Sequence, residues 1–136
     1  MDTRLTWDEW GLELAAAYAL RADCSRRQVG AVLMNPDHSI VASGYNGAPA
    51  GELGCLTSGA CPRGKSDVAP GSSYDTGAGT CIALHAEQNA LLRASWADMR
   101  GSTIYVTDEP CGGCWRMIAG TPIARAVWPG GERRNR

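Results

Sequence analysis

The hydrophobic pattern in the first part of the chain changes from a helical period to short apolar runs. Apolar residues with helical spacing extend from Trp7 to Arg21, and Thr6 followed by Glu9 is the signature of a capping box at the start of a helix. The segments 28–34 and 40–44 then flank the turn sequence NPDHS. The pattern predicts a helix followed by an antiparallel hairpin.

Periodicity disappears between residues 45 and 80, where glycine and proline are frequent and no clear element is predicted. Order returns in the second half of the chain. The pattern there predicts helices over 81–95 and 111–119, and strands over 102–107 and 124–128. The last residues, PGGERRNR at 129–136, have the composition of a flexible, solvated tail.

The order of these elements predicts the fold class. Strands joined through helices lie parallel with right-handed crossovers, whereas the hairpin strands are antiparallel. We therefore expect a mixed sheet covered by helices, which is a three-layer α/β domain. At 136 residues the chain has the length of a single domain, and we assign residues 1–136 to one domain.

Composition narrows the classes of partner. The formal net charge is −1 and charged residues make up 20% of the chain, so the basic excess typical of nucleic-acid binders is missing. The apolar run GLELAAAYAL is too short to span a membrane, and the acidic residues around it do not fit a signal peptide. We expect a cytoplasmic protein whose six cysteines are reduced or bound to metal.

A candidate metal site emerges from three residues that are far apart in the chain. Cys111 and Cys114 begin one predicted helix, and His85 lies in the preceding one, with a single strand between them. Helices that follow parallel strands start at the same edge of the sheet, so the three side chains can converge. Two sulfurs and one imidazole suit zinc, although a CxxC pair alone fits a redox pair or half of a structural zinc knuckle equally well.

Three protein ligands leave one tetrahedral position for water, which is typical of catalytic zinc. Glu87 follows His85 by two residues and points about 200° away from it on a helix, so the two side chains are not expected to bind the metal together. Glu87 is instead the candidate for moving protons between water and a substrate. The H-x-E and P-C-x-x-C motifs together form the zinc deaminase signature.

These motifs, with the segments CSRRQVGAVLMNPDHSIVASGYNGAPAG and IYVTDEPCGGCWRMIAGTPIARAVW, resemble the cytidine and deoxycytidylate deaminase superfamily, and most closely its deoxycytidylate branch. The resemblance implies a cytidine deaminase-like fold, a Zn²⁺ cofactor, a homo-oligomer, and a free pyrimidine nucleotide as substrate. The implied reaction converts dCMP to dUMP and releases ammonia, with Glu87 as the proton shuttle.

The resemblance also implies further site residues. Asn46 would hydrogen-bond the sugar or base, the backbone at Ala86 would meet the pyrimidine edge, and Arg26 or Arg27 would bind the phosphate. Both arginines are also consistent with solvated helix-end cations. Cys55, Cys61 and Cys81 match cysteines that hold a second, structural zinc in relatives, and Cys24 is the candidate for a fourth ligand. Free buried thiols are the competing interpretation for these cysteines.

Two other functions stay open at this stage. The chain can be a deaminase of another amino-bearing base, nucleoside or nucleic acid, or a non-catalytic zinc-stabilised module whose open coordination site is filled by protein. The chain also stops soon after the strand predicted at 124–128, where relatives usually continue. The sheet edge is then either that of a minimal variant or one completed by a neighbouring subunit.

Overall fold

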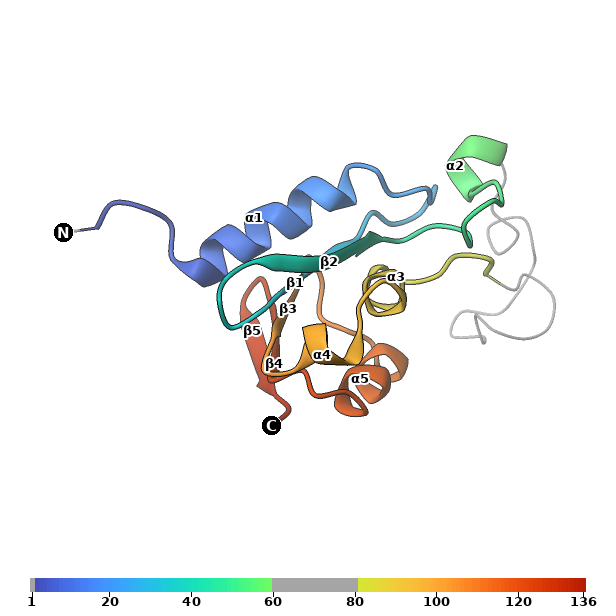
Figure 1. The fold of residues 1–136 in the computed structure, drawn as a ribbon. Coiled ribbons are helices and arrows are strands. Elements are labelled where there is room, and N and C mark those ends of the chain that lie inside the picture. Colours follow the sequence, from blue (N-terminus) through green and yellow to red (C-terminus); the bar gives the residue numbers. More distant parts are fainter. Residues whose placement is uncertain (1, 60–80) are drawn as a thin grey trace.

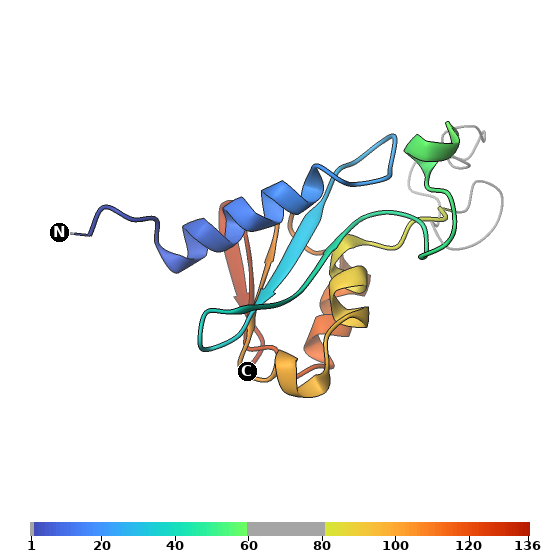
Figure 2. The ribbon, with the colours of Figure 1, turned by 45° about the horizontal axis from the view of Figure 1, so that its top comes forward.

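A mixed five-stranded sheet lies between helices on its two faces in the computed structural model, which describes residues 2–59 and 81–136 (Figure 1). The strand order is β2-β1-β3-β4-β5. The strands are β1 (Gly30–Met34), β2 (Ile40–Tyr45), β3 (Thr103–Val106), β4 (Arg125–Trp128) and β5 (Gly131–Arg134). The α1 helix (Trp7–Ala19) covers one face, while α3 (Ala86–Leu92) and α5 (Gly112–Ala119) cover the other, as Figure 2 also shows. The predicted three-layer α/β fold is confirmed.

The pairing of the strands follows from how they are connected. β1 and β2 form the predicted antiparallel hairpin, and β3 and β4, joined through α5, are parallel as predicted. β1 also pairs with β3, in the antiparallel sense. The carboxyl end of β3 and the amino end of β1 therefore lie at the same edge of the sheet, beside the N-termini of α3 and α5.

The core divides into two layers because side chains alternate across the sheet. All five residues of β1 are buried, which explains why this central strand is continuously apolar. Val32 and Met34 pack with Ala15 of α1 on one face. On the opposite face, Leu33 packs in a cluster that includes Ala86 of α3.

Two glycines let the helices approach the sheet backbone closely. A Cβ atom at Gly30 would overlap the carbonyl oxygen of Ala15 in α1. A Cβ atom at Gly44 would lie 2.5 Å from the carbonyl oxygen of Ala86, in the first turn of α3. Any side chain at either position would push a helix off the sheet, and at Gly44 it would displace the turn that carries Glu87.

The structure differs from the sequence prediction in the start of one helix and in two short helices that were not predicted. α3 begins at Ala86 rather than near residue 81, because Leu84 pairs as an isolated bridge with Gly47. A short helix, α4 (Trp96–Met99), follows it, with the Ser95 side chain accepting from the Asp98 N–H. A second short helix, α2 (Cys55–Ser58), lies in the segment where no element was predicted.

The predicted flexible tail at 129–136 is wrong for residues 131–134, which form β5 at the edge of the sheet. A turn with Gly130 at a φ of 85° reverses the chain after β4. The exposed pattern of β5 explains the error, because an edge strand with polar side chains has the composition of a solvated end. Beyond β5, the Asn135 side chain donates hydrogen bonds to three carbonyl oxygens at the end of α5 and in the following loop.

The described residues include no helix with both the length and the hydropathy needed to cross a bilayer.

Replacing Asn135 with alanine tests the assignment of the C-terminal segment. The carbonyl oxygens of Ile118, Thr121 and Ile123 would lose a donor at 3.2, 3.2 and 2.8 Å. We expect a loss of roughly 1–3 kcal/mol in the free energy of unfolding, measured by urea denaturation. The exposed Arg134→Ala serves as the control on the same segment, and equal midpoints for Asn135→Ala and wild type would contradict the structure.

Candidate active site

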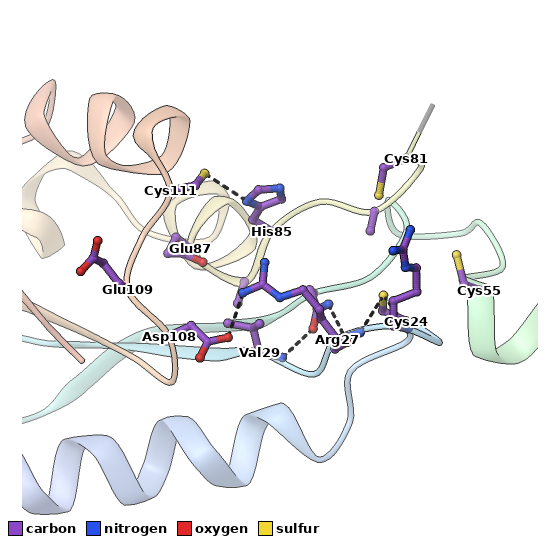
Figure 3. Close-up of a pocket in the computed structure, with 14 residues that line it drawn as sticks. Cys24, Arg27, Val29, Cys55, Cys81, His85, Glu87, Asp108, Glu109 and Cys111 are labelled. Atoms are coloured by element: carbon purple, nitrogen blue, oxygen red, sulfur yellow. Dashed lines mark hydrogen bonds and ion pairs between the residues drawn. The ribbon is translucent and has the colours of Figure 1, made fainter. Parts of the chain in front are cut away.

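A pocket opens where the N-termini of α3 and α5 face the ends of β1 and β3 (Figure 3). Sequence segments that are far apart converge on it: the turn before β1, the end of β2, the segment leading into α3, and the loop between β3 and α5. Its lining includes nearly all the residues predicted from the sequence, namely His85, Ala86, Glu87, Cys111, Asn46, Arg26 and Arg27.

His85, Cys111 and Cys114 bring three metal-binding atoms together. The His85 Nδ1 atom lies 3.1 Å from the Cys114 sulfur and 3.6 Å from the Cys111 sulfur. All three donor atoms lie within 4.8 Å of one another. Zinc bonds of about 2.0 Å to nitrogen and about 2.3 Å to sulfur place tetrahedral N and S ligands roughly 3.5 Å apart, so the donor set fits a zinc ion.

The local fold holds each ligand at a helix N-terminus. His85 is the N-cap of α3, and its backbone N–H donates to the Gln88 Oε1 atom at 2.7 Å. Cys111 is the N-cap of α5, and its sulfur accepts from the Cys114 N–H at 3.4 Å. Gln88 was not predicted as a site residue, although a Gln three residues after an N-cap is a recognisable signal.

The charges around Cys114 favour a bound cation. Burial raises the pKa of the Cys114 thiol well above its ordinary value, and the neighbouring Glu87 carboxylate and Cys111 thiol raise it further. Deprotonating this thiol would place another negative charge beside Glu87 in a buried site. A divalent cation offsets that cost, so metal binding and thiol ionisation are coupled.

Glu87 lies in the first turn of α3 and is the only buried carboxylate among the residues that the structure describes. It interacts with Cys114, and Figure 3 shows it beside His85 and Cys111 at the pocket wall. It is not part of the three-donor cluster. This is the arrangement expected of a proton shuttle next to a metal.

The residues expected to bind substrate lie in the same pocket, with their own contacts. Asn46 is buried, and its side chain accepts from the Val29 N–H at 2.8 Å and donates to the Arg27 carbonyl at 3.0 Å. Its predicted contact with a sugar or base stays a prediction. The Arg27 guanidinium forms an ion pair with Asp108 at 2.8 Å. Ala86 is fully buried, with its backbone in the first turn of α3.

Three of the four remaining cysteines, Cys24, Cys55 and Cys81, also line the pocket. The Cys24 sulfur accepts from the N–H groups of Arg26 and Arg27, each at 3.4 Å. Among the residues that the structure describes, these three cysteines do not form a three-ligand metal cluster like that of His85, Cys111 and Cys114. Cys61 lies outside the described residues.

Comparison with known proteins identifies the family. Residues 5–129 match the family model described as the cytidine and deoxycytidylate deaminase zinc-binding region. A deoxycytidylate deaminase of Mycobacterium phage D29 is 49% identical over 93% of this chain and 97% of that protein. A deoxycytidylate deaminase of Schizosaccharomyces pombe is 37% identical over 92% of this chain, which spans only 37% of that protein.

Solved structures agree with these relatives. The dCMP deaminase of cyanophage S-TIM5, in complex with dCMP and dUMP, has 26% identity and a TM-score of 0.65 over 93% of this chain and 83% of its own. The cytidine deaminase of Mycobacterium leprae has a TM-score of 0.56 at 15% identity, which shows a shared fold. The chain belongs to the cytidine and deoxycytidylate deaminase family, as predicted from its motifs.

Metal binding at this cluster is expected to depend on pH. Because zinc binds the thiolate forms of Cys111 and Cys114, its affinity should rise as pH increases from about 6 to 8, with protons released on binding. Calorimetric titration of zinc into the apo-protein, in buffers of different ionisation enthalpy, counts those protons. The Cys114→Ala variant should bind zinc at this site at least about 100-fold more weakly, since one of three ligands is lost. A wild-type affinity that does not change with pH would contradict thiolate ligation.

Proposed function

We propose that this chain catalyses the zinc-dependent hydrolytic deamination of a pyrimidine deoxynucleotide, converting dCMP to dUMP with release of ammonia. The observation that carries the proposal is the convergence of His85, Cys111 and Cys114 around one metal position, with buried Glu87 beside it. Family membership supports the reaction type. The two relatives described above are named deoxycytidylate deaminases, which supports dCMP as the substrate of this chain.

Each residue of the site has a distinct task in this reaction. His85, Cys111 and Cys114 would hold the zinc ion, which when bound supplies a Lewis acid that makes water acidic enough to react near neutral pH. Glu87 accepts a proton from the attacking water and donates it to the ring nitrogen. It then takes the second proton from the same oxygen, which becomes the carbonyl oxygen of the product, and passes it to the departing amine as the carbon–nitrogen bond breaks and ammonia leaves. Such proton transfers typically accelerate a reaction by about 10²–10⁴-fold.

The pocket also offers groups suited to the rest of a nucleotide. Arg26 and Arg27 both line it, and guanidinium groups bind phosphate through paired N–H donors. The structure of the cyanophage enzyme contains dCMP and dUMP, which supports a phosphorylated substrate for this chain as well. Asn46 would contact the sugar or base from the pocket wall, where it is buried and donates a hydrogen bond to the Arg27 carbonyl oxygen.

We further propose a second, structural zinc held by Cys24, Cys55, Cys61 and Cys81. Support comes from the three described sulfurs, which line one pocket, and from the N–H bonds that Cys24 accepts in a turn like the one at Cys111. Asp23 brings α2 to this turn, because its carboxylate accepts from the Gly54 N–H and from the Thr57 N–H and hydroxyl. The competing interpretation of these four cysteines is a set of reduced thiols that bind no metal.

The two competing functions make different predictions about Glu87. A deaminase of another base or nucleoside would need Glu87 and would differ only in substrate. A zinc-stabilised binding module would need the metal ligands and not the glutamate. The expected homo-oligomer and the cytoplasmic location stay predictions, and light scattering on the purified protein measures the first directly.

Replacing Glu87 with glutamine should abolish useful turnover while leaving zinc bound, because the amide preserves shape and cannot move protons. We expect ammonia release from dCMP to fall by at least about 100-fold at unchanged zinc content. The exposed Glu13→Gln on α1 serves as the matched control. Retained activity in Glu87→Gln would refute the catalytic role of this residue.

A substrate panel tests the choice of dCMP. Ammonia release is measured under one set of conditions for cytosine, cytidine, deoxycytidine, CMP, dCMP and dCTP, and for dAMP and dGMP as purine compounds. We expect the highest kcat/KM for dCMP, because the pocket places arginine side chains near a zinc-binding cluster. Activity on an adenine or guanine compound alone would refute the substrate while leaving the family assignment intact.

A further inference from the structure

The side chain of Gln88 connects the two helices that carry the metal-binding residues. Its Oε1 atom accepts from the His85 backbone N–H at 2.7 Å, and its Nε2 atom donates to the Met117 sulfur at 3.9 Å. His85 is the N-cap of α3, whereas Met117 lies on α5, the helix that also carries Cys114. The two helices lie side by side in Figures 1 and 2. Gln88 is not itself one of the three metal donors.

The peptide group between Leu84 and His85 is held at both of its edges. The Leu84 carbonyl accepts from the Gly47 N–H at 3.1 Å, and the His85 N–H donates to Gln88. A planar peptide held by both bonds cannot pivot about either one alone. The His85 carbonyl in turn accepts from the Asn89 N–H at 3.0 Å, in the first turn of α3. Both peptide groups that flank the His85 Cα atom are therefore fixed.

Fixing this backbone also fixes the direction of the imidazole. The atom that faces the sulfurs of Cys111 and Cys114 is Nδ1, the ring nitrogen nearer to the main chain, so its position follows the His85 backbone closely. Two of the three bonds that hold this backbone join main-chain atoms, which every sequence supplies. The third bond depends on the side chain of Gln88.

Two features keep the Gln88 amide in this orientation. The side chain is half-buried, so water competes only in part for the His85 N–H. The thioether of Met117 accepts hydrogen bonds and cannot donate them, so it favours the orientation that points Nε2 to Met117 and Oε1 to His85.

We propose that Gln88 is a positioning residue that sets the affinity for zinc by holding His85 Nδ1 toward the thiols of Cys111 and Cys114. The inference rests on the proposed function, since it concerns the same metal site. Donors that are already in place lose less conformational freedom when the metal binds. Residues that orient metal ligands typically change metal affinity by about 10–100-fold when they are replaced.

A simple helix cap is the alternative, and α1 provides the control for it. The Thr6 N–H donates to the Glu9 Oε1 atom at 2.8 Å, which is the same bond from an N-cap to the third helical residue. No member of the metal cluster lies on α1, which covers the opposite face of the sheet from α3. Losing the cap of α1 therefore reports the effect of capping alone.

The test compares Gln88→Met, Gln88→Glu and Glu9→Met in the zinc-loaded protein. Methionine is nearly isosteric with glutamine and has a similar helix propensity, but it has no amide. Glutamate keeps an oxygen that can accept from the His85 N–H. Competition with graded concentrations of a chelator measures the Kd for zinc, and the same titration of Cys114→Ala identifies zinc bound elsewhere in the chain.

A second measurement reports the geometry of the site. Cobalt(II) replaces zinc, and its absorption bands depend on the number and arrangement of its nitrogen and sulfur ligands. Subtracting the spectrum of cobalt-loaded Cys114→Ala isolates the bands of this cluster. A change of charge near the metal alters the affinity without moving a ligand, so the spectrum separates the charge of Gln88→Glu from the position of His85.

We expect Gln88→Met to bind zinc about tenfold more weakly and to have a shifted cobalt spectrum. Gln88→Glu should retain the wild-type spectrum and bind zinc no more weakly than wild type, and Glu9→Met should change neither. Four results would each overturn the inference: an unchanged Kd in Gln88→Met, a weaker Kd with an unchanged spectrum, a loss in Gln88→Glu equal to that in Gln88→Met, or an equal loss in Glu9→Met.

The proposed function fails or survives separately, because neither measurement needs turnover. If Gln88→Met weakens zinc binding as expected and the wild-type protein releases no ammonia from dCMP, the proposed function is wrong and the positioning role of Gln88 remains. If the wild-type protein is active and Gln88→Met binds zinc like wild type, the positioning role is wrong and the proposed function remains.

Discussion

The electrostatic cost of collecting anionic groups at one buried point governs the architecture of the site. Cys114 is buried next to Glu87, and Cys111 adds a second thiol. These groups are compatible in their ionised forms only when a cation lies among them. A cation bound there would also account for the histidine nitrogen that faces the two sulfurs at 3.1 and 3.6 Å. The fold thus presents a preformed set of donors whose ionisation depends on the metal.

The sheet and its helices supply this arrangement through backbone placement. The parallel β3–α5–β4 connection brings the N-terminus of α5 to the carboxyl edge of the sheet, and the close contact at Gly44 sets the first turn of α3 against β2. His85 and Cys111 occupy equivalent N-cap positions on the two helices. The candidate catalytic and metal-binding groups therefore lie on helix N-termini packed against the sheet, which suits chemistry that requires fixed geometry.

The sequence predicted most of the fold because hydrophobic periodicity and turn residues agree for the central elements. It also predicted the metal cluster. The H-x-E and P-C-x-x-C motifs begin two successive helices with one strand between them, so both motifs are expected at the same edge of the sheet. Its errors have local causes. The bridge between Leu84 and Gly47 joins residues far apart in the sequence, so the pattern placed the start of α3 too early. The edge strand β5 has polar, exposed residues, so its sequence resembled a solvated tail. The Ser95 and Asp98 capping signal for α4 was present and was missed.

Contacts between distant loops were beyond the reach of sequence patterns. Nothing in the spacing of Arg27 and Asp108 predicts their ion pair, since they are joined only through the packing of β1 against β3. The two backbone partners of Asn46 likewise depend on how the end of β2 meets the turn before β1. These contacts lie in the wall of the pocket, whereas the motifs determine which reaction is possible.

Anomalous X-ray scattering at the zinc absorption edge, from crystals of the protein purified with its metal, tests the central claim most directly. The account predicts an anomalous peak that lies about 2.0 Å from His85 Nδ1 and about 2.3 Å from the sulfurs of Cys111 and Cys114, with no fourth protein ligand. A peak with a fourth protein ligand, or no peak among these three residues in zinc-containing protein, would contradict it.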